Sequence, residues 1–273
     1  MNALPIKTMI NEDYHRHDSI SKSGLDLIAK SPAHFRYAAH REPTRAMTLG
    51  TATHMAILEP DLYAAQYVTL PDGVDRRSSV YKEAVKTRSE DLVLLRSEAD
   101  RIEGMTAAVR GNREAQLILG RAGVAEASLF ATDPVTGVAV RCRFDWLTYD
   151  LHAVDLKTTA AADDDSFAKS IVNYRYFVQE AFYRDVFQWA TGEKLRSFTF
   201  LAVESEMPHC VTMPVLADDV VAYGRQLYRR DLNRYADCLA SGVWPGLDGA
   251  PHVIGMPGWF VAQIENDMEV SYE

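Results

Sequence analysis

The chain has 273 residues, of which 47% are hydrophobic and 25% charged, a composition typical of a globular protein with a sizeable core. Its formal net charge of −9 argues against a generally basic nucleic-acid coat, but not against a basic groove. No apolar run reaches the ~20 residues of a membrane helix, and the N-terminus lacks a signal peptide's apolar stretch, so we expect a cytoplasmic protein without membrane contact.

In chain order, a helical first part precedes a region that alternates strands and helices. Ser21 or Ser23 is a candidate N-cap for the first clear helix. Helices are predicted at about 24–30, 48–59, 79–119 (with breaks near Gly104 and Gly111), 175–191 and 218–240. Strands are predicted at about 124–131, 137–147, 152–158, 198–204 and 210–215.

This order of elements indicates an α/β fold with a mixed central sheet of four to five strands flanked by helices. We expect a single domain over residues 1–273, with two lobes as the alternative. Its helical part would run to about residue 120 and the catalytic sheet and helices from about 121 to 245. The acidic tail over 260–273 is expected to be loosely ordered.

The segment from Val138 to Thr159 has the period-2 pattern of a hairpin. On the first strand Phe144 and Trp146 share the apolar face, and Arg143 and Asp145 share the other. If the hairpin is centred on Asp150, Asp145 faces Asp155 and Arg143 faces Lys157, with Cβ atoms of opposed residues ~4.5–5.5 Å apart. Two carboxylates so close require a cation and the two neighbouring cations require an anion, so a divalent metal and a phosphate would satisfy both.

Further motifs surround this hairpin. Gly50 precedes His54 by four residues on one helix, and Gln179 precedes Tyr183 by four on another. A carboxylate, about ten residues and then Asp-x-Lys resembles the PD-(D/E)xK nuclease superfamily. The flanking motifs, with Ser19–Leu25 and Ser31–Phe35 near the start, most resemble the RecE (exonuclease VIII) nuclease domain and related phage proteins. Phe144 stands in place of the proline of the superfamily name.

The resemblance implies roles for these residues. It implies catalytic residues at Asp145, Asp155, Lys157, Gln179 and Tyr183, and metal ligands at His54, Asp145, Asp155 and the Leu156 carbonyl. Mg²⁺ is the expected ion because it prefers oxygen ligands, and the His54 imidazole suggests that Mn²⁺ also supports activity. Lys157 would orient or activate water and stabilise charge; the alternative is an ordinary sheet salt bridge. For Gln179 and Tyr183 the alternative is helix packing.

Other residues are weaker candidates. By resemblance, Ser23, Arg16 and Arg143 are candidates for binding DNA or a 5′-phosphate, with simple capping as the alternative for Ser23. Glu126 could support a second metal or simply face solvent. Glu180 and Arg184 are expected to be solvated, and the arginines at 225, 229, 230 and 234 to form a solvated helix face.

The function implied is a metal-dependent exodeoxyribonuclease that degrades linear double-stranded DNA from 5′ to 3′ and leaves 3′ single strands for recombination. Relatives form rings, which implies a homo-oligomer (tetramer or trimer), and an annealing protein of the RecT type is an expected partner. No iron–sulfur cluster is expected, because three dispersed cysteines cannot supply four ligands. The alternatives are another nuclease with this core (a single-strand exonuclease or an endonuclease), a non-catalytic DNA-binding scaffold, or an unrelated α/β hydrolase.

Overall fold

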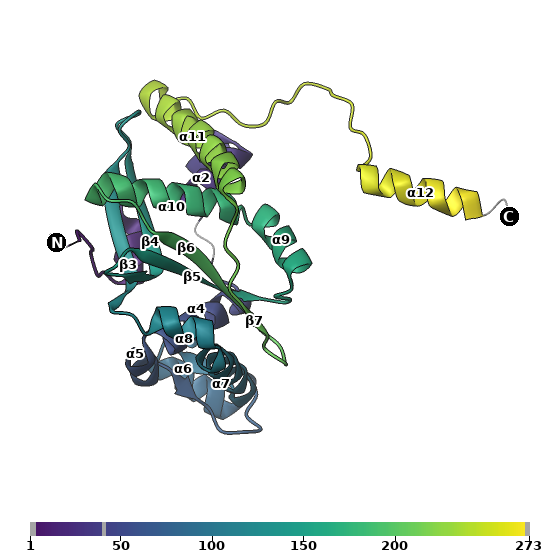
Figure 1. Cartoon of the computed structure of the whole chain (residues 1–273). Helices are drawn as coiled ribbons and strands as arrows, with labels where there is room; N and C mark the ends of the chain where they lie inside the picture. Colours follow the sequence, from purple (N-terminus) through teal and green to yellow (C-terminus); the bar gives the residue numbers. More distant parts are fainter. Residues whose placement is uncertain (1–3, 40–41, 271–273) are drawn as a thin grey trace.

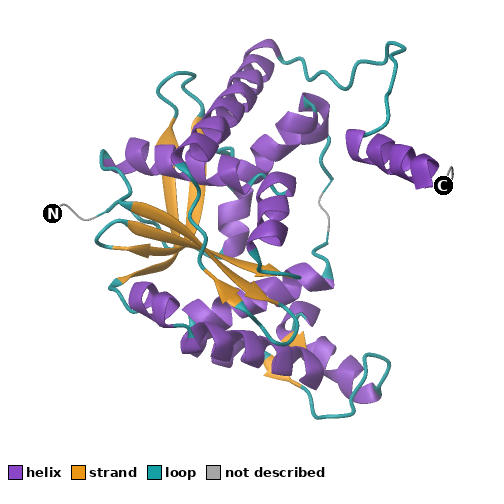
Figure 2. Cartoon of the chain, turned by 45° about the vertical axis from the view of Figure 1, so that its right-hand side comes forward, coloured by secondary structure: helices purple, strands orange, loops and turns teal. Residues whose placement is uncertain are grey.

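A mixed five-stranded sheet lies between two layers of helices in the computed structural model, which describes residues 4–39 and 42–270 (Figures 1 and 2). Its strands, in spatial order, are β3 (Gly123–Thr132), β4 (Ala139–Thr148), β5 (His152–Thr159), β6 (Ser197–Glu204) and β7 (Val211–Thr212). Only β5 and β6 pair in parallel; the other neighbours are antiparallel. The predicted α/β class with a mixed central sheet is confirmed.

The two helical layers come from different parts of the chain (Figure 1). Above the sheet lie α2 (Lys22–Lys30), α3 (Pro32–Arg36), α9 (Asp164–Asn173), α10 (Tyr176–Thr191) and α11 (Asp218–Ser241). Below it lie α4 (Arg45–Leu58), α5 (Pro60–Gln66), α6 (Ser79–Thr87), α7 (Arg96–Gly111) and α8 (Arg113–Leu119). The remaining helices are α1 (Asn11–Arg16), a 3₁₀ turn (Glu90–Leu92) and α12 (Gly258–Val270).

Each face of the sheet buries its own core. Phe144 and Phe198 lie in the upper core with Phe182 and Phe187 of α10. The lower core is formed by apolar residues of β5, β6, α4 and α7, including Val154, Leu156, Leu201, Ala52, Ile102 and Met105. Alternate residues of β5 therefore enter the lower core, as the period-2 pattern predicted, and leave Asp155 and Lys157 for the opposite face.

Some elements differ from the sequence prediction. The chain continues as helix through Gly104, where a break was expected. The glycine makes room for His209, because a Cβ at position 104 would lie 2.5 Å from the His209 Nε2 atom. The break after Gly111 is confirmed, with Asn112 accepting from the Ala115 N–H at 3.0 Å. A small parallel sheet, β1 (Val68–Thr69) with β2 (Val93–Leu94), was not predicted. Helix α12 occupies most of the expected tail.

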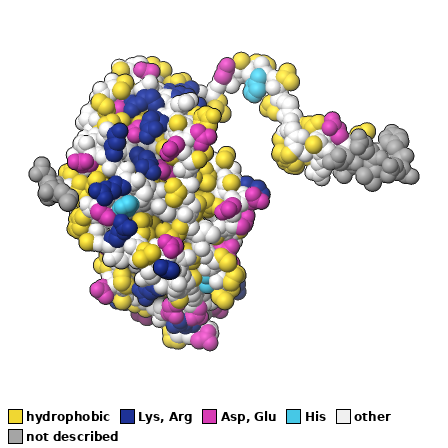
Figure 3. Space-filling model, in the orientation of Figure 1, with side chains coloured by type: hydrophobic (Ala, Val, Ile, Leu, Met, Phe, Trp, Pro, Cys, Tyr) yellow, Lys and Arg dark blue, Asp and Glu magenta, His cyan; other side chains and the backbone are white. Residues whose placement is uncertain are grey.

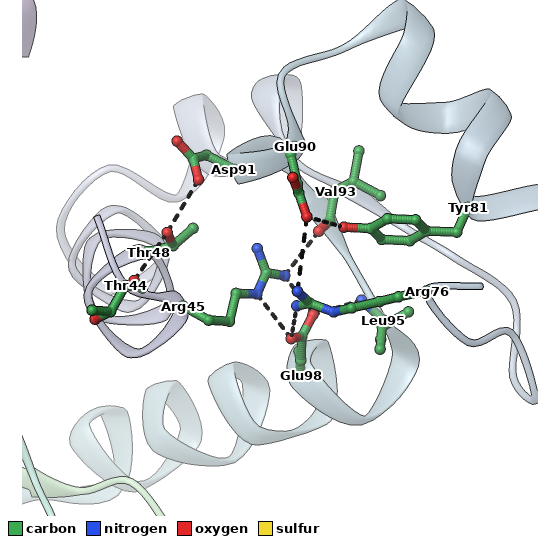
Figure 4. Close-up of polar contacts among 10 residues, drawn as sticks. All are labelled: Thr44, Arg45, Thr48, Arg76, Tyr81, Glu90, Asp91, Val93, Leu95 and Glu98. Carbon is green, nitrogen blue, oxygen red and sulfur yellow. Dashed lines mark hydrogen bonds and ion pairs between the residues drawn. The ribbon is translucent and has the colours of Figure 1, made fainter. Parts of the chain in front are cut away.

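Polar contacts at the start of α4 hold this helix against α7 (Figure 4). The Arg45 guanidinium donates to Glu98 Oε1 at 2.9 Å and to the Val93 carbonyl at 2.9 Å. Arg76 donates to the same Glu98 carboxylate at 2.7 Å, and Thr48 donates to Asp91 at 3.1 Å. Bidentate arginine–carboxylate pairs are geometrically specific, so this network fixes the direction of the helix that carries the candidate metal ligand His54.

Within the described residues, no helix has the length and apolarity needed to span a membrane.

Candidate active site

A cavity of about 870 Å³ opens between α2, α4 and α10 at the point where β4 and β5 part. It brings together most of the predicted site residues, namely Ser23, His54, Arg143, Asp145, Asp155, Lys157, Gln179 and Tyr183. The Leu156 side chain lies in the lower core instead, and Arg16 is not among the residues that line the cavity.

The hairpin register places the acidic residues. Trp146 pairs with Val154 and Leu147 with Ala153, which is the predicted register, but the pairing ends there. Beyond it the Asp145 carboxylate enters between the strands and accepts a hydrogen bond of 2.6 Å from the Leu156 N–H. The expected pairs Asp145–Asp155 and Arg143–Lys157 are not formed, because the strands have separated before those positions.

The alternation of faces on β4 changes at Asp145. Phe144 lies in the upper core and Trp146 packs against the lower core, so the prediction that the two residues share a face is wrong. On β3 the residue opposite this point is Glu126, between the pairs Ala125–Trp146 and Ala127–Phe144. Its φ of 49° lies in the left-handed region that a non-glycine residue rarely adopts. This local departure from strand geometry turns Glu126 and Asp145 toward each other.

Glu126, Asp145 and His54 form a candidate metal centre. One ligand atom from each lies within 4.8 Å of the others, and His54 Nδ1 is 3.6 Å from Asp145 Oδ2. Burial and the neighbouring Asp145 raise the pKa of Glu126 to about 8, and burial also raises the pKa of Asp145. Arg143 lies 3.6 Å from Glu126 and compensates part of the negative charge of these partly buried carboxylates. Two carboxylates and an imidazole at this spacing still supply donor atoms that fit a divalent cation.

Glu126 was expected to support a second metal or to face solvent. The structure places it in one cluster with His54 and Asp145, with its side chain 32% exposed. The turn over residues 133–137 is the feature of the sequence that could have placed Glu126 near Asp145. Folding β3 onto β4 about this turn brings Glu126 close to Asp145, although the register is uncertain by one residue when the turn type is unknown. The left-handed backbone could not be inferred from a glutamate.

Asp155, Lys157 and Gln179 form a second, connected group. Lys157 makes a close ion pair with Asp155, which is only 2% exposed. The Gln179 amide donates to Asp155 and accepts from Lys157 Nζ at 3.4 Å, so one side chain orients both. Burial lowers the pKa of Lys157, but the Asp155 and Asp145 carboxylates outweigh it and raise the pKa overall. The lysine is therefore held as an ammonium ion beside the acidic cluster.

Helix α10 supplies Gln179 and Tyr183 from one face, as their spacing predicted. Tyr183 packs edge-on against Phe144, with ring centroids 5.3 Å apart, and burial raises its pKa well above the usual value. Glu180 is not solvated as expected: it is 1% exposed and pairs with Arg184 at 2.8 Å. The upper helices cover this face of α10, and the i,i+4 arginine compensates the buried carboxylate.

The weaker candidates lie in different places. Ser21, not Ser23, caps α2 by accepting from the Gly24 N–H at 3.4 Å, which leaves Ser23 at the cavity wall. Arg143 is 9% exposed and donates to Ser128, Asn11 and the Met9 carbonyl. Arg16 is exposed and pairs with Glu12. A phosphate-binding role for these three residues remains a prediction.

Sequence analysis did not single out several residues at the cavity mouth. Lys22 and Asp26, one turn apart on α2, form an ion pair of 2.8 Å, and Arg175 at the start of α10 also binds Asp26 at 3.0 Å. The i,i+4 spacing of Lys22 and Asp26 was a usable signal that they share a helix face. The contact with Arg175 joins residues far apart in sequence and had no such signal.

Positive side chains gather over α10 and α11 on the face that Figure 3 shows, despite the negative net charge. On α11, two of the arginines expected to form a solvated face bind aspartates of other elements. Arg225 pairs with Asp185 at 2.7 Å and Arg229 with the buried Asp133 at 2.7 Å. Arg230 is 58% exposed and pairs at 2.7 Å with Asp231 on the same helix, so Arg225 and Arg229, but not Arg230, join α11 to other elements.

Comparison with known proteins gives a match to a family and a solved structure of similar fold. Residues 21–253 match the family described as PDDEXK-like domain of unknown function (DUF3799). A solved structure from Eubacterium rectale, provisionally described as an exonuclease, is 14% identical with a TM-score of 0.64, covering 92% of this chain and 96% of that one. An alkaline exonuclease from Laribacter hongkongensis is 12% identical with a TM-score of 0.29, covering 67% of this chain and 97% of that one. No curated protein matches the sequence.

The family match covers most of the chain, including the residues from Ser23 to Tyr183 that line the cavity. The similarity to the Eubacterium rectale structure concerns the fold. The chain belongs to the PDDEXK-like DUF3799 family, within the PD-(D/E)xK nuclease superfamily.

Proposed function

We propose that this chain is a metal-dependent 5′-to-3′ exodeoxyribonuclease that acts on linear double-stranded DNA. The observation that carries the proposal is the convergence of His54, Asp145, Asp155 and Lys157 on one cavity, with Glu126 within ligand distance of His54 and Asp145. In phosphodiester hydrolysis the attacking hydroxide and the phosphate are both anionic, so the reaction needs positive charge between them. Metal-binding side chains beside a lysine would supply that charge.

Different residues would bind the metal, stabilise charge on the phosphate and hold these groups in position. His54, Glu126 and Asp145 would hold a divalent ion, with Asp155 and the Leu156 carbonyl as further oxygen ligands. Bound there, Mg²⁺ or Mn²⁺ would acidify water and neutralise charge that develops on the phosphate. The Lys157 ammonium would donate to the developing oxyanion or orient the attacking water. Gln179 would keep Lys157 and Asp155 in place, and the partly buried Tyr183 ring, packed on Phe144, would hold this face of α10 against the sheet.

Polarity and biological role are inferred from the resemblance to the RecE nuclease domain. On this proposal digestion leaves a 3′ single strand, which an annealing protein of the RecT type would use in phage or prophage recombination. A homo-oligomeric ring, a trimer or tetramer, would keep the enzyme on one DNA end. Mg²⁺ as the working ion is part of the same proposal.

The proposal is tested by incubating the purified chain with linear duplex DNA or covalently closed circles, with Mg²⁺, Mn²⁺ or EDTA. We expect metal-dependent degradation of linear DNA and none of the closed circles. Cutting of closed circles would replace the exonuclease proposal with an endonuclease. Absence of cleavage with either metal, together with DNA binding, would favour a non-catalytic scaffold.

A further inference from the structure

An exposed aromatic side chain stands at the mouth of the cavity. Tyr174 lines the cavity and is 62% exposed. Its ring stacks on Tyr176, with centroids 5.6 Å apart and planes 24° apart, and Tyr176 stacks on Phe200 at 5.5 Å and 27°. A column of three near-parallel rings therefore runs from the upper core to the cavity mouth and ends in an accessible tyrosine.

The backbone under this tyrosine is held in an unusual conformation. Arg175, between the two stacked tyrosines, has a φ of 54°. Its guanidinium is clamped by Asp26 of α2 at 3.0 Å and Asp231 of α11 at 2.5 Å, and Lys22 Nζ donates to the Tyr174 carbonyl at 2.6 Å. A residue in a strained backbone conformation persists only where the surrounding contacts hold it there, and such residues are frequent at ligand-binding sites. The backbone that carries Tyr174 is thus held in place by contacts to α2 and α11.

The column also contacts the candidate catalytic lysine. Lys157 Nζ lies 4.7 Å from the centre of the Tyr176 ring, and the Tyr174 ring stacks on this same ring. A nucleotide with its phosphate beside Lys157 and Asp155 would have a base within reach of Tyr174. Lys30 of α2 lines the same cavity and suits a neighbouring backbone phosphate, whereas Lys22 is engaged by Asp26 and the Tyr174 carbonyl.

We propose that Tyr174 is a stacking platform for a nucleobase of the DNA strand held in the cavity, an inference that rests on the proposed nuclease function. Every base has a π-face, so the platform would bind strands without reading their sequence. Tyr174 would be a positioning residue that sets the base next to the reacting phosphate, and it would take no part in the chemistry itself.

The test measures DNA affinity in an Asp155→Asn background, so that the strand is not consumed. Tyr174→Leu, which removes the ring, is compared with Tyr174→Phe, which keeps it. Tyr223→Leu on α11 is the matched control, because Tyr223 is 61% exposed and is not among the residues that line the cavity. Each variant is titrated with intact oligonucleotide duplexes and with duplexes carrying one abasic site at successive positions near the end.

We expect Tyr174→Leu to weaken binding of intact DNA by about tenfold, with Tyr174→Phe and Tyr223→Leu close to the parent. An abasic site at the stacked position should weaken binding by the parent and leave Tyr174→Leu unaffected. Equal affinities of Tyr174→Leu and parent, or equal losses at every abasic position, would overturn the platform and leave the nuclease proposal standing. A parent chain that binds no DNA would overturn both.

Discussion

At the scale of single residues, Asp145 connects the two halves of the candidate site. Its carboxylate accepts from the Leu156 N–H, next to Asp155, and also lies beside His54 and Glu126. This position exists because β4 and β5 stop pairing after Trp146 and Val154. The sequence predicted the register at Trp146–Val154 and Leu147–Ala153, whereas no local pattern predicted that the strands separate beyond these pairs.

Asp155→Asn should abolish DNA cleavage and leave DNA binding intact. The substitution keeps the shape and the hydrogen bond from Gln179 but removes the buried charge that pairs with Lys157 and would bind metal. Cleavage of labelled duplex and affinity by fluorescence anisotropy measure the two effects. Asp165→Asn, at an exposed position of α9, is the control. Retained cleavage by Asp155→Asn would remove this residue from the site.

Lys157→Ala should lower turnover by about 10²–10³-fold, as for loss of a group that stabilises transition-state charge. Metal affinity should survive, since the carboxylates and His54 remain. Single-turnover cleavage and metal titration by calorimetry separate the two properties, with Lys169→Ala on α9 as an exposed control. Full activity in Lys157→Ala would show that the lysine forms only a structural ion pair.

Glu126 should make the metal-free protein less stable as pH rises. Its folded-state pKa of about 8 lies above the ordinary glutamate value of 4.5, so the folded chain retains a proton that the unfolded chain has lost. Stability from this group is full below pH 4.5 and is lost as the pH rises to about 8; Asp145, with its raised pKa, acts in the same direction.

Melting in EDTA across this range tests the prediction. Glu126→Gln should show a smaller decline than the parent, and added Mn²⁺ should stabilise the parent more than the variant at the alkaline end. Identical pH profiles for parent and variant would mean that Glu126 ionises freely and is not part of a coupled cluster.

At the scale of elements, periodicity was informative where one face is buried. The strands around Asp145 and Asp155 and helices α10 and α11 lie within a few residues of the prediction, because each has a continuous apolar face. Gly104 misled the prediction because the helix uses glycine for a close contact with His209, not for a break. Such contacts join segments far apart in the chain and are not visible in local sequence.

Gly224 should be intolerant of a side chain. A Cβ at this position on α11 would lie 2.1 Å from the Phe177 carbonyl oxygen of α10, which is backbone and cannot rotate away. We expect Gly224→Ala to lower the free energy of unfolding by about 1–3 kcal/mol. Gly111→Ala, where nothing lies within 4 Å, should instead raise it by up to about 1 kcal/mol. Urea unfolding measures both, and a neutral Gly224→Ala would mean that α10 and α11 can separate.

At the scale of the whole molecule, a compact body carries a separate C-terminal arm (Figure 1). Sheet, cavity and both helical layers are formed before Gly242, and an extended segment then leads to α12. None of the described α12 side chains joins the buried cores, and Trp259 is 70% exposed. The acidic tail was predicted from composition, but its helix was not, because it has no apolar face packed on the body.

Deletion of residues 258–273 should therefore leave the melting temperature unchanged, because the arm adds no core packing. Differential scanning calorimetry of the full and shortened chains makes the comparison, with light scattering to record the oligomeric state of each. A marked drop in melting temperature with an unchanged oligomeric state would show that α12 packs on the body of its own chain.

The central claim is that the Asp145–Asp155–Lys157 centre hydrolyses DNA from its ends. The most direct measurement follows linear duplex labelled at the 5′ or the 3′ terminus, with Mg²⁺, for the parent and for Asp155→Asn. We expect the parent to release the 5′ label early, as mononucleotide, and the variant to release none. Early release of the 3′ label would contradict the polarity, and equal release by parent and variant would contradict the assignment of the site.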